Sequence, residues 1–401
     1  MSSAKLKTII LAITALFLAV SIIAFPKVSV DASLNGLKLW WNVVFPSLLP
    51  FFIVSELMIG FGIVTFIGVL LEPIMRPIFK VPGAGAFVFV MGLASGFPAG
   101  AKITSRLYEE KKLTKTEAER LASFTNFSNP LFIFGVVAYG FFHQAALGIV
   151  FALSHYLGNI CVGLIMRFYR PNERSLSEKE RATPAIFIKA LKHMHRERIR
   201  NKQPLGKMLG DAVQTSVSTL LMVGGFIILF SVLNQLFARL HITDSIAYVI
   251  KHLLLLLHFS PDLSKGIVPG LFEITVGAKN ISSLQAPLLQ QVIVACFILG
   301  FAGFSIQAQV ASILADAKLS AKPFFIGRLI HGTASACAAF VLFQYVDIKQ
   351  SSFQVNAVVE SLENHILPEN WTSYLQIGSS VTLITLIIYI LTKAYANMKK
   401  I

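Results

Sequence analysis

Two apolar stretches of this chain are interrupted in the same way. The first reads Pro82-Gly-Ala-Gly-Ala-Phe-Val-Phe-Val-Met-Gly-Leu-Ala-Ser-Gly-Phe-Pro-Ala-Gly-Ala-Lys102, and the second ends Gly270-Leu-Phe-Glu-Ile-Thr-Val-Gly-Ala-Lys279. Both are rich in glycine and proline, and both finish in Gly-Ala-Lys, 177 residues apart. Because glycine and proline weaken or break helices, each stretch predicts two short helical arms joined by a break.

The rest of the sequence is typical of a membrane protein. The chain is 55% hydrophobic and 14% charged, whereas soluble domains carry about 25% charged residues. A spanning helix needs about 20 apolar residues, and the continuous runs do not alternate as barrel strands would. The sequence therefore predicts an all-α integral membrane protein with about eight transmembrane helices, at roughly 6–26, 39–66, 121–142, 145–166, 210–237, 288–315, 324–346 and 373–392.

The net charge of +15 is carried mainly by loops. Cytoplasmic loops of membrane proteins are enriched in Lys and Arg, and twelve of the 35 basic residues lie between 167 and 207. We therefore predict a multi-pass protein of the cell membrane with both termini in the cytoplasm, contacting membrane lipids and not nucleic acid. The predicted segments, in chain order, are an N-terminal transmembrane helix 1–30, repeat one 36–168, a basic cytoplasmic loop 169–208, repeat two 209–346, an external loop 347–372 and a C-terminal transmembrane helix 373–401.

The two predicted repeats match at several places in order. Phe124–Pro130 aligns with Phe301–Gln307, and each copy keeps Phe-x-x-Phe-Ser. His155 and Cys161 align with His331 and Cys337 if the offset between the copies is reduced by one residue. If the basic loops are placed in the cytoplasm, the first helix of copy one runs inward across the membrane and the first helix of copy two runs outward. The repeats are therefore predicted to be inverted.

Inverted repeats with broken helices are common in secondary transporters, which bind solute near the midplane where the repeats meet. We therefore interpret 82–102 and 261–280 as re-entrant hairpins, and expect partial unwinding at Asn126–Pro130 and Gly303–Gln307. The alternative is a set of short buried helices whose glycines serve close packing.

Glu273 is the only acid well inside either broken stretch. A carboxylate inside a membrane is a functional hypothesis by default, although a water-exposed hairpin tip or a bridge to Lys279 would explain it structurally. Amides and hydroxyls beside the breaks can bind a polar solute or only join helices. The candidate solute-binding residues are Ser95, Pro98, Asn126, Ser128, Asn129, Glu273, Thr275, Ser305, Gln307 and Gln309.

Three further residues are candidates for a proton-carrying or helix-packing role: His155, His331 and Glu56. No metal site is predicted, because the three cysteines lie in apolar runs without metal-ligand spacing. Thr116-Glu-Ala-Glu119 fits a capping box at the start of a helix. No phosphate loop or nucleophile motif is present, so we predict no catalytic residue and no enzymatic activity.

Three motifs carry a family resemblance: Trp40–Phe52, Met91–Lys102 and Glu119–Gly135. They resemble the sporulation integral membrane protein YlbJ family, which is similar to nucleoside recognition (gate-domain) membrane proteins. The resemblance implies a role in endospore formation, and in spore cortex assembly within it. Phe124–Ser128 and Gly300–Ser305 are similar to a motif of concentrative nucleoside transporters, which implies paired hairpins with Glu273 and Ser305 near a ligand. Copy one departs from that pattern, because Gly96 stands opposite Glu273.

Two functions follow as expectations. The first is transporter-like handling of a small polar solute, with no cofactor other than coupling Na+ or H+. The second is a non-transporting scaffold that recruits sporulation or cortex-assembly proteins at 169–208. Self-association into a homo-oligomer is left open by both.

Overall fold

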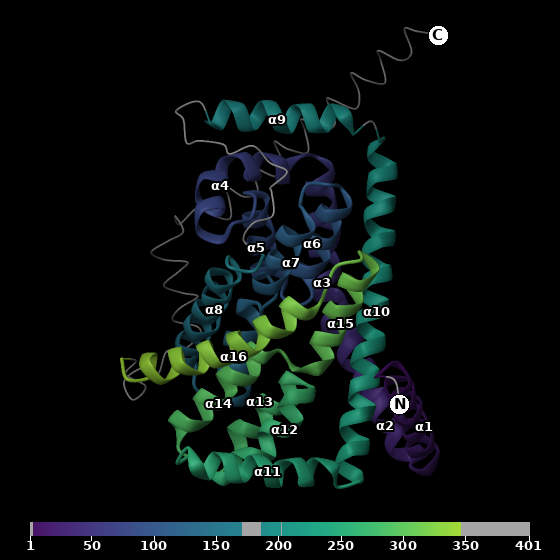
Figure 1. Ribbon diagram of the computed structural model, residues 1–401, viewed down its shortest axis with the longest axis vertical. Coiled ribbons are helices and arrows are strands. Elements are labelled where there is room, and N and C mark those ends of the chain that lie inside the picture. The colour runs from purple at the N-terminus through teal and green to yellow at the C-terminus, as the bar shows by residue number, and fades with distance from the viewer. Residues whose placement is uncertain (1–2, 171–185, 202, 346–401) are drawn as a thin grey trace, which may run out of the picture. The chain divides into compact units, whose positions relative to one another are not determined.

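The computed structural model describes residues 3–170, 186–201 and 203–345, which contain helices and no strand. They belong to one compact unit, Met1–Asp347 (Figure 1). The predicted external loop and C-terminal transmembrane helix lie outside the described residues, as does part of the basic loop. The all-helical prediction is confirmed for the residues described.

The described helices fall into an N-terminal pair followed by two series of similar order. Each series has a first helix, a second helix joined to it by a two-residue link, two short helices, a broken helix and a closing helix, and α9 (Ile186–Arg200) lies between the two series. The first part is α1 Ser3–Ala24, α2 Pro26–Leu39, η1 Trp40–Val44, α3 Phe45–Gly60, α4 Ile63–Phe79, α5 Ala84–Ser95, α6 Ala99–Glu109, α7 Lys115–Phe124, η2 Leu131–Phe141 and α8 Leu147–Met166. The second part is α9 Ile186–Arg200, α10 Leu205–Arg239, α11 Ile242–Leu256, η3 Pro261–Leu263, α12 Ser264–Phe272, α13 Ile274–Ser283, α14 Leu288–Phe301, α15 Gly303–Asp316 and α16 Lys322–Leu342.

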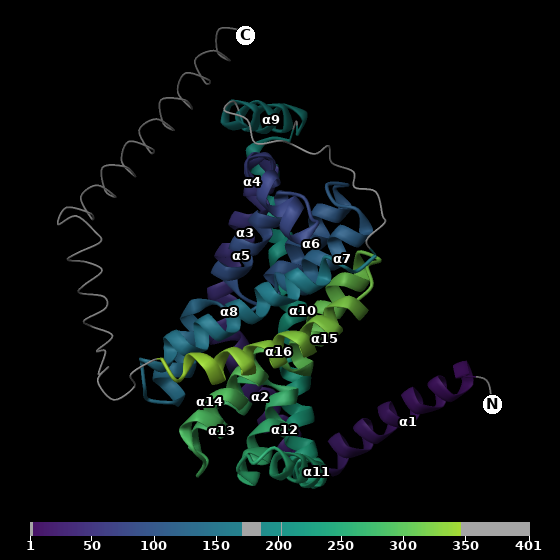
Figure 2. The same ribbon diagram turned by 60° about the vertical axis from the view of Figure 1, so that its left-hand side comes forward.

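Four helical segments are long and apolar enough to cross a membrane, or up to six if each bent pair is one span. The four are α8, α10, α14 with α15, and α16. The bent pairs join α1 to α2 at 101° and α3 to α4 at 79°, and α1 projects from the other helices (Figure 2). Of the eight predicted spans, 121–142 is interrupted between α7 and η2, and 373–392 lies outside the described residues.

Both Gly/Pro-rich stretches form pairs of short helices in contact, as predicted. The turn between α5 and α6 contains Gly96, whose φ is +85°, a conformation open to glycine at little cost. The arms α12 and α13 pack through Gly270 against Gly277 and Gly266 against Ile281, which is the pairing of an antiparallel hairpin. The arms extend beyond the prediction at one end, because α6 continues to Glu109.

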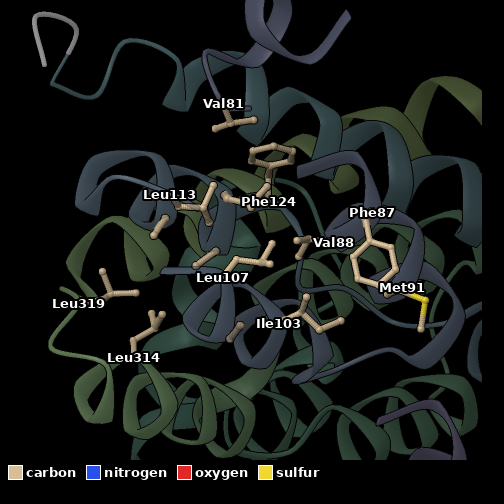
Figure 3. Close-up of a cluster of buried hydrophobic side chains, with 14 of the residues drawn as sticks. Val81, Phe87, Val88, Met91, Ile103, Leu107, Leu113, Phe124, Leu314 and Leu319 are labelled. Atoms are coloured by element: carbon tan, nitrogen blue, oxygen red, sulfur yellow. The ribbon is translucent and has the colours of Figure 1, made fainter. Parts of the chain in front are cut away.

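A cluster of buried side chains holds the first hairpin against helices from both halves of the chain. Phe87 and Val88 of α5 and Leu107 of α6 belong to the same cluster as Phe124 and Leu314 of the broken helices (Figure 3). The arms of this hairpin therefore pack against protein rather than lipid, which is where membrane-depth breaks are tolerated.

The strongest packing joins α8 to α16, and α16 to α14. Small residues allow this approach: a Cβ on Gly158 would meet Ser335, and one on Gly300 would lie 2.8 Å from Gly332 Cα. In membranes, small residues at helix contacts let backbones approach and gain dispersion energy. Helices from the two halves of the chain therefore pack directly against one another.

The capping box lies two residues before its predicted place. Thr114, not Thr116, is the N-cap of α7, and its side chain and that of Glu117 bond reciprocally to the backbone. Thr114–Glu117 and Thr116–Glu119 both match the four-residue pattern of a capping box. The prediction of a capping box at Thr116–Glu119 was therefore wrong by two residues. Glu119 is instead buried and accepts hydrogen bonds from Tyr169 Oη at 2.8 Å and Ser320 N at 3.0 Å.

Candidate functional site

The segment between α7 and η2 is tied to the first hairpin by two asparagines. Asn126 Oδ1 accepts a hydrogen bond from Ala101 N of α6 at 2.9 Å. Asn129 Nδ2 donates to the Ser95 carbonyl at 3.2 Å, and its Oδ1 accepts from Phe132 N at 2.9 Å. The unwound segment 125–129 and the hairpin turn therefore form one hydrogen-bonded unit, close to the unwinding predicted at Asn126–Pro130.

Side chains also donate hydrogen bonds to the carbonyl groups at the carboxyl end of α7. The last four carbonyls of a helix lack intrahelical partners, and a membrane interior offers no water to replace them. Each of the four accepts a side-chain donor here: Leu121 O from Thr125 Oγ1, Ala122 O from Asn126 Nδ2, Ser123 O from Arg328 and Phe124 O from Asn159 Nδ2.

Arg328 of α16 is wholly buried beneath this break. Its guanidinium donates to Ser123 O at 2.5 Å and to Asn126 O at 2.6 Å. It also stacks over the Phe324 ring at 5.1 Å and lies 3.3 Å from Asn159 Oδ1. Sequence reasoning missed Arg328, although a basic residue three positions before His331 on an apolar helix was a usable signal.

The two predicted histidines meet where α8 crosses α16, with ring centroids 4.5 Å apart. His331 Nδ1 lies 3.0 Å from the Arg328 guanidinium, and its Nε2 lies 2.7 Å from the His155 carbonyl. Because a guanidinium only donates and a carbonyl only accepts, His331 carries its proton on Nε2. His155 Nε2 accepts from Ser128 N at 3.0 Å, which connects the histidines to the unwound segment.

Four buried polar atoms around this break have no hydrogen-bond partner among the described residues. Native interiors pair nearly all such atoms with protein, water or ligand. Two of them belong to the predicted residues Ser95 and Ser128. The four atoms are Ser95 Oγ, Ser128 Oγ, His155 Nδ1 and Arg328 Nε.

The second break is shorter than expected. Only Ala302 interrupts the helix, with φ +67°, and α15 resumes at Gly303. Gln307 Nε2 donates to the Phe301 carbonyl at 2.9 Å, and Gln309 Nε2 lies 3.5 Å from Ser305 Oγ. The expected unwinding over Gly303–Gln307 is therefore wrong, because Gln307 reaches back and satisfies the carboxyl end of α14 from within α15.

Glu273 forms the turn of the second hairpin. Its carboxylate accepts hydrogen bonds from Thr275 N at 3.0 Å and Val276 N at 2.8 Å, which makes it the N-cap of α13. Capping satisfies two otherwise unpaired backbone donors. The described contacts do not join Glu273 or Thr275 to the cluster around Asn126, and no ion pair with Lys279 is present among the described residues.

Replacing Glu273 by alanine should therefore lower stability by about 1 kcal/mol, the usual loss when a cap is removed. The Glu273→Gln variant keeps one acceptor and should lose less. Thermal unfolding of the purified variants measures this. Equal stability of all three proteins would contradict the capping role.

Two neighbouring polar cavities lie between α6 and α10. The larger, of about 630 Å³, is lined by Lys102, Ser105, Arg106, Glu109, Gln214, Thr215, Ser218, Thr219, Met222, Ser312, Ile313 and Asp316. The other, of about 550 Å³, shares Arg106 and Thr215 with it. Glu56 lines the smaller cavity and lies 3.5 Å from Arg106 Nε in an ion pair. Neither cavity is lined by the other predicted site residues.

Lys102, the last residue of the first Gly-Ala-Lys, is half-buried in the larger cavity. Glu56, Glu109 and Asp316 are near enough to interact electrostatically with it, but among the described residues no carboxylate lies within the 4.0 Å of an ion pair. Ser105 Oγ, in the same wall, is buried and has no partner among the described residues. The cavity wall therefore carries a lysine without an ion-pair partner among the described residues.

These features define a multi-pass, all-helical integral membrane protein with hairpins, broken helices and a polar cavity. The family model described as "Gate: Nucleoside recognition" matches residues 41–145 and 220–317. The sporulation integral membrane protein YlbJ of Bacillus subtilis (strain 168) is 50% identical over 98% of both chains. The chain belongs to the family of that protein.

Two further matches are weaker. An uncharacterized protein of Alkalihalophilus pseudofirmus is 35% identical over 32% of this chain and 26% of its own length. A solved structure of a doubly substituted CNTnw in an outward-facing state covers 81% of this chain and 85% of its own, at 12% identity and a TM-score of 0.40.

Proposed function

We propose that this protein acts in endospore formation, and in spore cortex assembly within it, as a transporter-like membrane protein for a small polar solute. The relative named for sporulation supports the biological role. The observation that supports solute binding is the cavity of about 630 Å³, whose wall includes Lys102 without an ion-pair partner among the described residues. A half-buried lysine without an ion-pair partner in the wall of a polar cavity can form a charge-assisted hydrogen bond to a polar solute.

The proposal includes an inverted-repeat architecture in the cell membrane with both termini in the cytoplasm. The similar order of helices in the two halves supports it. So does the packing of α8 on α16 and of α3 on α10, which are corresponding elements. In such transporters, rocking of one part against another exposes a central site alternately to each side.

Solute uptake into proteoliposomes tests the proposal directly. A panel of labelled small polar solutes, nucleosides included, is offered to vesicles with the wild-type protein and with Lys102→Met. We expect at least one solute to accumulate above empty vesicles, and the variant to reduce that uptake about tenfold or more, because hydrogen bonds to charged groups contribute roughly 1.5–3 kcal/mol. Lys102→Arg, which keeps the charge, is the matched control. Correctly folded wild-type protein that moves none of the solutes would contradict the proposal.

The second candidate is a scaffold, and α9 favours it. Its inner face packs on α4, with Phe187 against Phe66 at 5.5 Å. Ile188 and Ile199, however, are 70% and 61% exposed beside basic residues. Exposed apolar side chains among charges can mark an interaction site.

The double variant Ile188→Ser with Ile199→Ser separates the two functions. A non-transporting scaffold should lose sporulation, since both exposed side chains belong to the surface that would recruit a partner. A transporter should keep both sporulation and solute uptake, because neither side chain lines the cavity. Heat-resistant spore counts and vesicle uptake, measured for the same variant, decide between them.

A further inference from the structure

The carbonyls at the break after α7 already hold a cation. Ser123 O lies 2.5 Å and Asn126 O 2.6 Å from the guanidinium nitrogens of Arg328, with the amide oxygen of Asn159 at 3.3 Å. A guanidinium remains charged in proteins. No carboxylate forms an ion pair with Arg328 among the described residues. Its charge is therefore compensated by oxygen dipoles of the break itself.

Unwound carbonyls and the carboxyl ends of half-helices are the groups with which secondary transporters coordinate a coupling sodium ion. The carboxyl end of a helix carries a partial negative charge of about half an electron, which favours a cation there. In this chain the carbonyl groups of Ser123 and Asn126 converge in the same way, but the Arg328 side chain of α16 occupies the position that an ion would take.

We infer that Arg328 is a built-in cation that substitutes for a coupling sodium ion at this break, so that solute binding by the protein is independent of sodium. The neighbours of Arg328 fix it there. His331 accepts from it at 3.0 Å and is itself held by the His155 carbonyl, while the Phe324 ring lies beneath the guanidinium. A sodium ion would have to displace these contacts and approach a like charge.

The statement that solute binding is independent of sodium rests on the proposed function. The statement that Arg328 excludes sodium from the break does not. Thermal unfolding of the purified full chain is measured in sodium, potassium and choline chloride at equal ionic strength. We expect the wild-type Tm to be the same in all three salts. Arg328→Met exposes the vacated oxygens, so sodium should raise its Tm specifically, by about 2–5 °C if binding stabilises the fold by 1–2 kcal/mol.

Arg328→Lys is the control, because it keeps a cation at the break and should stay indifferent to sodium. A sodium-specific rise in the wild-type Tm would overturn the inference. So would an Arg328→Met protein that folds but gains no sodium response. If that variant folds in no salt, equilibrium dialysis of the wild-type protein with labelled sodium decides: stoichiometric binding refutes the inference, and its absence supports it. Failure of the uptake experiment alone would leave these results unchanged.

Discussion

Replacing Gly100 by alanine should lower the free energy of unfolding by about 3 kcal/mol or more and abolish function. A methyl carbon on Gly100 would collide with the Thr125 carbonyl oxygen and lie 2.8 Å from Thr125 Oγ1. Gly92, on the other arm of the hairpin, faces the same carbonyl. Both arms of the hairpin therefore approach the unwound segment through glycine, and backbone atoms cannot move aside as a flexible side chain can.

The matched control is Gly225→Ala in α10. A Cβ at Gly225 meets no atom within 4 Å, and alanine is the better helix former by up to about 1 kcal/mol. This variant should therefore be as stable as the wild type or slightly more so. Thermal unfolding of both purified variants gives the comparison. A Gly100→Ala protein with wild-type stability would mean that the hairpin does not dock on the break.

Replacing Arg76 by methionine should cost about 3–5 kcal/mol, because breaking a buried ion pair leaves charge without compensation. Arg76 bridges Glu72 at 2.6 Å and Glu117 at 2.7 Å, and each carboxylate side chain is only 4% exposed. Glu72 also accepts from Gly83 N at the start of the first hairpin. The loss should therefore loosen the contact between α4, the hairpin and α7.

Adding Glu117→Gln to Arg76→Met should recover part of the loss, since one of the two uncompensated charges is removed. The exposed pair of Lys265 with Asp262, at 2.9 Å, is the control; Lys265→Met should change stability by less than about 1 kcal/mol. Denaturation midpoints of the four proteins test this. Equal losses for Arg76→Met and Lys265→Met would mean that the buried ion pairs of Arg76 stabilise the fold no more than an exposed pair does.

The helix breaks were predictable because glycine and proline act locally. Gly96 and Pro98 mark the first turn, and the predicted unwinding at Asn126–Pro130 lies within one residue of the observed segment 125–129. The second break was predicted too long, because the duplication suggested an equal length and nothing local showed that Gln307 would cap α14. Local patterns place breaks well but do not reveal which side chain satisfies them.

The structure brings some of the predicted site residues together. Ser95, Asn126, Ser128, Asn129, His155 and His331 do form one connected set. Arg328 at its centre was missed, because its partners are carbonyls more than 200 residues away in the chain. The cavity around Lys102 was also missed, since it arises where α6, α10 and α15 meet and no single segment encodes it.

The most direct measurement is a sporulation assay on a deletion strain complemented with Lys102→Met, Lys102→Arg or the wild-type gene, with protein levels checked by blot. Heat-resistant spores are counted for each strain. We expect Lys102→Met to be present at normal levels yet to yield few heat-resistant spores, whereas Lys102→Arg should retain much of the wild-type yield. A normally expressed Lys102→Met protein that supports full sporulation would contradict a solute-binding cavity as the basis of function.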